Sequence, residues 1–102
     1  MSDLKQRLID EINEQISLKE KEMKESEQEL ETLNARLKVE KKALEMKDVA
    51  NDLKEDFKYS AQALESMLMM EQNKNSELKK EIVMLHFRDA VVDSQFSNNE
   101  LK

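Results

Sequence analysis

The chain carries, between residues 9 and 44, the stretch IDEINEQISLKEKEMKESEQELETLNARLKVEKKAL. An apolar residue recurs in it at every seventh position, in the ladder Ile9, Ile16, Met23, Leu30, Leu37 and Leu44. A strict seven-residue repeat places these side chains in one narrow seam along a helix that supercoils left-handed around a partner helix. The stretch therefore predicts an α-helical coiled coil.

The composition favours long helices over a compact globule. Of the 102 residues, 39% are charged and 38% are hydrophobic, and glycine and proline are both absent. An average protein of this length holds roughly 7% glycine and 5% proline, many of them at sharp turns. Disordered chains are also highly charged, but they are usually rich in proline and glycine and lack a periodic apolar pattern. We therefore expect an all-α, elongated helical coiled coil with few sharp turns.

The second row of the seam is only partly apolar. With the ladder at the a positions of the heptad, the d positions are Ile12, Lys19, Ser26, Leu33, Glu40 and Lys47. Polar d residues weaken a coil, and either they select its register and partner or a weak coil simply tolerates them. The predicted oligomer seam consists of Ile9, Ile12, Ile16, Met23, Leu30, Leu33, Leu37 and Leu44.

Charge is segregated along the same helix. Residues 20–31 hold six glutamates and two lysines, whereas residues 36–47 hold five basic and two acidic residues. Two copies paired antiparallel about a centre near Leu33 would bring opposite charges together, and so would a different partner with the reverse pattern. Pairing through the coiled coil is thus expected, as a homomer or a heteromer.

The apolar pattern is irregular at two places. After Leu44 the phase shifts, because Ala50 follows after six residues rather than seven, and such a shift marks either local overwinding or a turn. A turn over residues 45–52 would need Asn51 as a left-handed C-cap, so we favour a continuous helix there. Residues 72–76 (QNKNS) favour a bend, and the alternative is that Asn75 lies buried in the seam and fixes its register.

The apolar surface of the last helix is wider than one seam can cover. Five of the six residues from Ile82 to Phe87 are apolar, so we expect this helix to pack in a multi-helix bundle. The predicted organisation is a rod segment over 1–70, a break over 71–76, a partner-docking helix over 77–96 and a frayed tail over 97–102. The predicted partner-docking residues are Leu64, Met67, Leu68, Leu78, Ile82, Leu85, Phe87, Val91, Val92 and Phe96.

Motifs for catalysis and for cofactor binding are missing from the sequence. Phosphate-binding loops, EF-hands and nucleophile elbows need glycine, and thiolate sites need cysteine, which is also absent. In a di-iron helical bundle the residue three positions before the histidine ligand is a glutamate. Three positions before His86, the sole histidine, the residue is Val83. The net charge of −6 opposes binding to nucleic acid or to anionic membranes. We expect no enzymatic activity and no catalytic, cofactor-binding or metal site.

In composition and periodicity, over its whole length, the chain resembles the small coiled-coil subunits of kinetochore, centrosomal, synaptonemal and vesicle-tethering assemblies. The resemblance implies a non-enzymatic structural or scaffold subunit that oligomerises and bridges protein partners. The alternative is a compact two- or three-helix adaptor or chaperone-like binding module. Because the sequence shows neither a signal peptide nor a membrane span, we expect an intracellular protein, cytoplasmic or nuclear.

Overall fold

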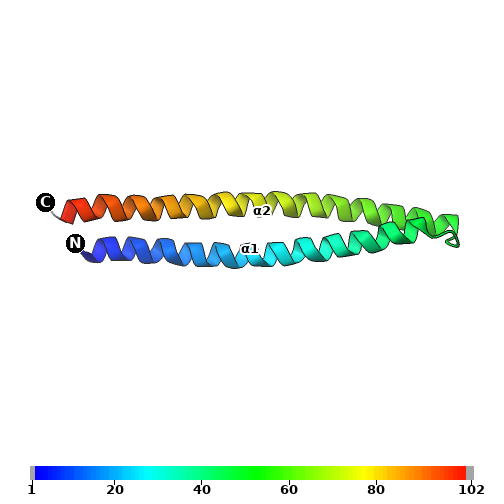
Figure 1. Cartoon of the computed structure of the whole chain (residues 1–102), viewed down its shortest axis with the longest axis horizontal. Coiled ribbons are helices and arrows are strands. Elements are labelled where there is room, and N and C mark those ends of the chain that lie inside the picture. Colours follow the sequence, from blue (N-terminus) through cyan, green and yellow to red (C-terminus); the bar gives the residue numbers. More distant parts are fainter. Residues whose placement is uncertain (1, 101–102) are drawn as a thin grey trace. The chain divides into compact units, whose positions relative to one another are not determined.

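The computed structural model describes residues 2–100, with side chains for residues 3–96. These residues form two helices, α1 (Ser2–Glu45) and α2 (Asn51–Glu100), joined by a short connection over 46–50 (Figure 1). Residues 2–100 contain no strand. The prediction of an all-α coiled coil is therefore confirmed.

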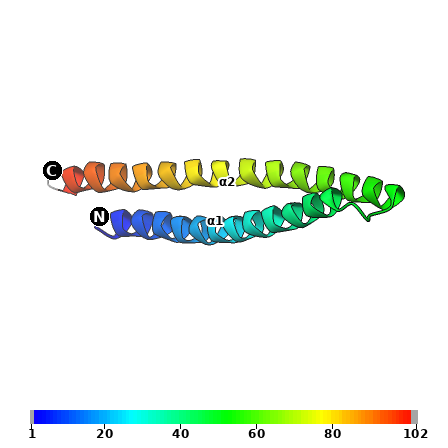
Figure 2. The same cartoon turned by 45° about the vertical axis from the view of Figure 1, so that its right-hand side comes forward.

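The two helices contribute to two packed units. The hairpin unit is Glu25–Asn75, and the terminal unit joins the part of α1 up to Lys24 with the part of α2 from Ser76 onward. In each unit the α1 and α2 segments lie side by side and antiparallel, as Figures 1 and 2 both show. The helix that covers the seam of α1 is thus supplied by the same chain.

The turn at 46–50 forms without any left-handed residue. The Met46 N–H donates to the Ala43 carbonyl at 3.2 Å, and the Lys54 N–H donates to the Ala50 carbonyl at 2.9 Å, which opens α2. No residue with positive φ occurs in the part of the chain that the structure describes. The expectation of a continuous helix over 45–52 was wrong, because an irregular turn can form from ordinary right-handed and extended conformations once the flanking helices pack together. Asn51 is not a C-cap but the first residue of α2.

Residues 72–76 remain helical within α2, so the predicted bend and the break at 71–76 are absent. Asn75 lies buried in the seam, as the alternative for this segment expected, since it is only 7% exposed and its amide donates to Ser26. An asparagine that finds a partner across the seam has no need to satisfy its side chain by ending a helix. At the tail, α2 extends to Glu100, and residues 101–102 of the predicted frayed tail lie outside the described residues.

Two matching ladders face each other within the chain. Every α1 position assigned to the seam between Ile9 and Leu44 is buried or half-buried. On α2 a ladder spaced alternately by four and three residues is buried or half-buried at every position: Phe57, Ala61, Leu64, Leu68, Glu71, Asn75, Leu78, Ile82, Leu85, Asp89, Val92 and Phe96. In the hairpin unit the core cluster is Leu33, Leu37, Ala61 and Leu64, with Leu44 and Leu68 packed against it. In the terminal unit Ile16, Leu78 and Leu85 are buried.

Candidate protein-interaction surface

A hydrogen-bonded polar layer interrupts the apolar seam of the hairpin unit. The Ser26 hydroxyl donates to Glu71 Oε2 at 2.6 Å and accepts from Asn75 Nδ2 at 3.4 Å. Ser26 is 2% exposed and Asn75 is 7% exposed. Because a shift of one helix against the other would leave these groups buried without partners, the layer selects one register. The polar d residue Ser26 therefore has a structural explanation.

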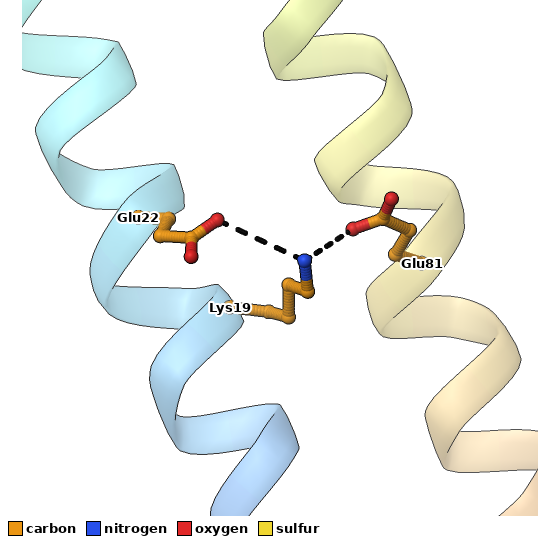
Figure 3. Close-up of polar contacts among 3 residues, drawn as sticks. All are labelled: Lys19, Glu22 and Glu81. Carbon is orange, nitrogen blue, oxygen red and sulfur yellow. Dashed lines mark ion pairs between the residues drawn. The ribbon is translucent and has the colours of Figure 1, made fainter.

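In the terminal unit a charged contact between α1 and α2 likewise favours one register. Lys19 Nζ lies 2.8 Å from Glu81 Oε2 on α2 and 3.9 Å from Glu22 Oε2 on its own helix (Figure 3). The hydrogen bond to Glu81 is the main cause that raises the pKa of Lys19 above its ordinary value of 10.5. Partial burial acts in the opposite direction, and the negative charges of Glu22 and Glu81 add to the increase. A lysine at a d position is thus neutralised by a glutamate from the facing helix.

Further ion pairs link the facing helices in both units. Lys5 Nζ lies 3.2 Å from Asp93 Oδ1 in the terminal unit, and Lys41 Nζ lies 3.6 Å from Glu65 Oε1 in the hairpin unit. Lys41 belongs to the basic block of α1, which was expected to face the acidic block of a second copy or of a different partner. In the structure its acidic contact, Glu65, belongs to the same chain, and charge pairing between chains stays a prediction.

The outer face of α2 in the terminal unit carries large exposed apolar side chains around Lys80. We define the outer stripe as Val83, Met84, Phe87 and Val91, which are 53%, 51%, 69% and 56% exposed. Their spacing places them on one side of the helix, away from the seam residues Ile82 and Leu85. The solvent-facing positions of a two-stranded coil are normally polar or charged. This stripe is therefore the strongest candidate for a contact with another protein.

The predicted partner-docking residues divide between the two faces of α2. Seven of them lie in the seam against α1: Leu64, Leu68, Leu78, Ile82, Leu85, Val92 and Phe96. The other three, Met67, Phe87 and Val91, are exposed. Docking through any of the ten stays a prediction. The eight residues of the predicted oligomer seam likewise face α2 of the same chain, and their use in contacts between chains also stays a prediction.

Val83 and Met84 are exposed on this face but are absent from the predicted partner-docking residues. The signal was present in the phase of the second ladder, because Leu78, Leu85 and Val92 recur every seven residues and place both residues on the outer side. The apolar run from Ile82 to Phe87 was expected to pack against more than one neighbour. In the structure it divides into residues that face α1 and residues that face outward.

Two further apolar features lie beside the seam. In the hairpin unit a shallow groove is lined by Leu33, Met67 and Met70, with Glu29, Glu71 and Lys74 also lining it. In the terminal unit a smaller groove includes Met84 and Leu85 together with Gln15, Lys19, Glu81 and Arg88. Met84 thus borders both this groove and the outer stripe.

The described residues contain no group of three or more His, Cys, Asp or Glu side chains placed to hold a metal ion. His86 is exposed on α2. Over the same residues, neither helix combines the length and the apolar character needed to cross a bilayer. Comparison with protein-family models, with curated proteins and with solved structures gave no match. Function is therefore inferred from the chain's own surface.

Proposed function

We propose that the chain is a non-enzymatic coiled-coil scaffold subunit that binds a protein partner through the outer stripe of α2. The observation that carries the proposal is the exposure of Val83, Met84, Phe87 and Val91 side by side on a helix whose opposite face is already packed. Clusters of exposed apolar side chains in a polar surface are typical of interaction sites. The intramolecular seam leaves this face free for a partner.

The size of the stripe indicates a modest affinity. Four large side chains, each more than half exposed, present on the order of 400 Å² of apolar surface, and covering it is worth roughly 10 kcal/mol at about 25 cal/mol per Å². Association itself costs about 4–15 kcal/mol. The apolar stripe alone therefore supports weak binding, and polar contacts at its edges are needed for a specific complex.

The wider role in this proposal is to oligomerise and bridge partners within an intracellular assembly of the kinetochore, centrosomal, synaptonemal or tethering type. The charged outer face of α1 and the apolar outer face of α2 differ in chemistry, which suits contacts with more than one partner. The competing function is a two-helix adaptor or chaperone-like module. The observation that favours it is the exposed methionine group Met67, Met69 and Met70, because flexible methionines adapt to varied apolar ligands.

Photo-crosslinking tests the proposed contact. Benzoylphenylalanine would replace Phe87 in one variant and Tyr59 in a matched control, since both are aromatic residues of α2 with nearly equal exposure, 69% and 68%. We expect irradiation of cells that express the variants to give discrete protein adducts from position 87 and none of the same adducts from position 59. Absence of adducts at 87, or the same adducts at both positions, would contradict protein binding by the stripe.

A further inference from the structure

We infer that the partner on the outer stripe is an α-helix of another protein whose apolar face is bordered by acidic side chains. The inference rests on the proposed protein-binding function and names the chemistry of the partner. Two observations support it. The exposed positions around the stripe have the spacing of a coiled-coil seam, and the charged residues beside them that remain unpaired are positive.

The spacing on the outer face of α2 is that of a second seam. The exposed positions that alternate spacings of four and three residues are Lys80, Met84, Phe87, Val91 and Ser94. At about 100° per residue these positions lie on the side of the helix opposite the seam with α1. A second helix packs against a row of side chains with this spacing. The face therefore fits a helical partner, and docking leaves the seam with α1 intact.

Lys80 is compatible with such a contact. Its side chain is 73% exposed, and its Nζ lies 3.6 Å from Oε1 of Glu77, one turn earlier on the same helix. A lysine can lay its aliphatic stem along an apolar surface while its ammonium reaches the edge. A short charge-assisted hydrogen bond measures about 2.7–2.9 Å, so the contact with Glu77 is a loose one. The ammonium has three donors and can also bind a carboxylate of the partner.

The unpaired charges at the two edges of the stripe are also positive. Arg88 lies one turn from Met84, and Lys79 lies one turn from Val83 on the other edge. Both basic residues are exposed. Among the side chains that the structure describes, neither Lys79 nor Arg88 forms an ion pair. Both cations are therefore available to a partner.

Two acidic residues of the same segment are held by α1 instead. Oε2 of Glu81 lies 2.8 Å from Nζ of Lys19 (Figure 3), and Oδ1 of Asp93 lies 3.2 Å from Nζ of Lys5. Both carboxylates thus have a cation beside the seam. A chain with a net charge of −6 consequently presents an apolar stripe bordered by cations. This surface is complementary to a helix that carries Asp or Glu beside its apolar positions.

An anionic membrane surface would also match apolar and basic groups, but it fits this helix less well. Helices that lie in a membrane interface carry many lysines and arginines on the face opposite the apolar one. In α2 the opposite face is the seam that α1 covers, and the net charge of the chain repels an anionic surface. The observations therefore favour an acidic helix over a membrane.

Two synthetic peptides test the sign of the partner's charge. Each is about 21 residues long, with leucine at the seam positions of three heptads, and they differ only in carrying glutamate or lysine at the flanking positions. Fluorescence anisotropy measures their binding to the full chain. We expect the glutamate peptide to bind in the micromolar range and at least about tenfold more tightly than the lysine peptide. The net charge of the whole chain predicts the opposite preference, so the two explanations can be separated.

Variants of the chain locate the contact. Lys79→Glu and Arg88→Glu should each bind the glutamate peptide about three- to fivefold more weakly. Their matched control is Lys58→Glu, the same change of charge at an exposed lysine of α2 in the hairpin unit, which should have a much smaller effect. Phe87→Ser should weaken binding at least about tenfold, whereas Tyr59→Ser, at an aromatic residue with nearly equal exposure, should not. Circular dichroism and urea unfolding verify that all variants keep the wild-type fold.

Four outcomes overturn the inference. They are no binding of the glutamate peptide up to about 1 mM, equal or tighter binding of the lysine peptide, edge variants that behave like Lys58→Glu, and binding to phosphatidylserine vesicles without binding to either peptide. The last outcome would indicate a membrane contact.

The adducts formed in cells distinguish this inference from the proposed function. We expect the segment linked to position 87, when sequenced by mass spectrometry, to have a heptad apolar pattern and a net negative charge. If the linked segment is basic or has no helical pattern, protein binding by the stripe stands and the acidic helix is the wrong partner. If position 87 forms no adducts at all, both proposals fail.

Discussion

The polar layer at Ser26 gives the sharpest test of how the hairpin is specified. In Ser26→Ala the hydroxyl that donates to Glu71 Oε2 at 2.6 Å is lost, and the buried Asn75 amide loses its acceptor. A hydrogen bond to a charged group contributes about 1.5–3 kcal/mol to stability, whereas alanine regains up to about 0.7 kcal/mol through its higher helix propensity. We therefore expect the free energy of unfolding to fall by about 1–2.5 kcal/mol.

Urea unfolding followed by circular dichroism measures this change, with the slope of the transition compared between variants. The matched control is Ser66→Ala, the same substitution at an exposed serine of α2, for which only the helix-propensity gain is expected. A double-mutant cycle with Glu71→Ala separates the Ser26–Glu71 contact from other effects and should give a coupling of at least about 1 kcal/mol. If Ser26→Ala behaves like Ser66→Ala, or if the coupling is within error of zero, the layer does not stabilise the hairpin as argued.

Two further perturbations address the core and the charged contact. Leu33 is 1% exposed within the core cluster, so Leu33→Ala should lower the free energy of unfolding by about 2–5 kcal/mol, whereas Val39→Ala, at a 67% exposed position of the same helix, should change it by no more than about 0.5 kcal/mol. Equal effects in urea unfolding would show that α2 does not cover Leu33. Because the folded pKa of Lys19 is raised, its contribution is complete below pH 10.5 and is lost as the pH rises through the higher folded value. The stability of the wild type relative to Lys19→Met should therefore be constant at neutral pH and fall above pH 10.5, and a difference that stays flat into the alkaline range would exclude this contact.

Much of the helical architecture was accessible from local patterns. The ladder from Ile9 to Leu44 correctly predicted which face of α1 is buried, because a seven-residue repeat is a property of neighbouring residues along one helix. The polar residues Lys19 and Ser26 at d positions could be identified from the same repeat, with register selection and simple tolerance as the two open explanations. Their partners Glu81 and Asn75 could be assigned only once the antiparallel alignment was known.

The turn was harder to predict than the helices. Residues 46–50 contain no glycine or proline, and the structure has no left-handed residue in the described chain that would have marked the turn. Whether the seam is covered by α2 or by another molecule is a competition between folding within one chain and association of two. The entropy of closing a short connection is small and independent of concentration, whereas association of separate chains costs translational freedom. The repeat pattern within one helix does not show whether folding within the chain or association of two chains has the lower free energy.

The outer stripe shows most clearly which features follow from the sequence pattern and which follow from the packing of the helices. Periodicity and composition were sufficient to predict helices, a seam, and an apolar excess between Ile82 and Phe87 that one seam cannot cover. The phase of the α2 ladder separates Ile82 and Leu85 from Val83, Met84 and Phe87, and the packing of α2 against α1 decided that the first set is covered and the second exposed. The physical reason is that the exposure of a side chain depends on what packs against its helix. A helix can carry apolar residues on several sides, and the neighbour that covers one side leaves the others for a partner.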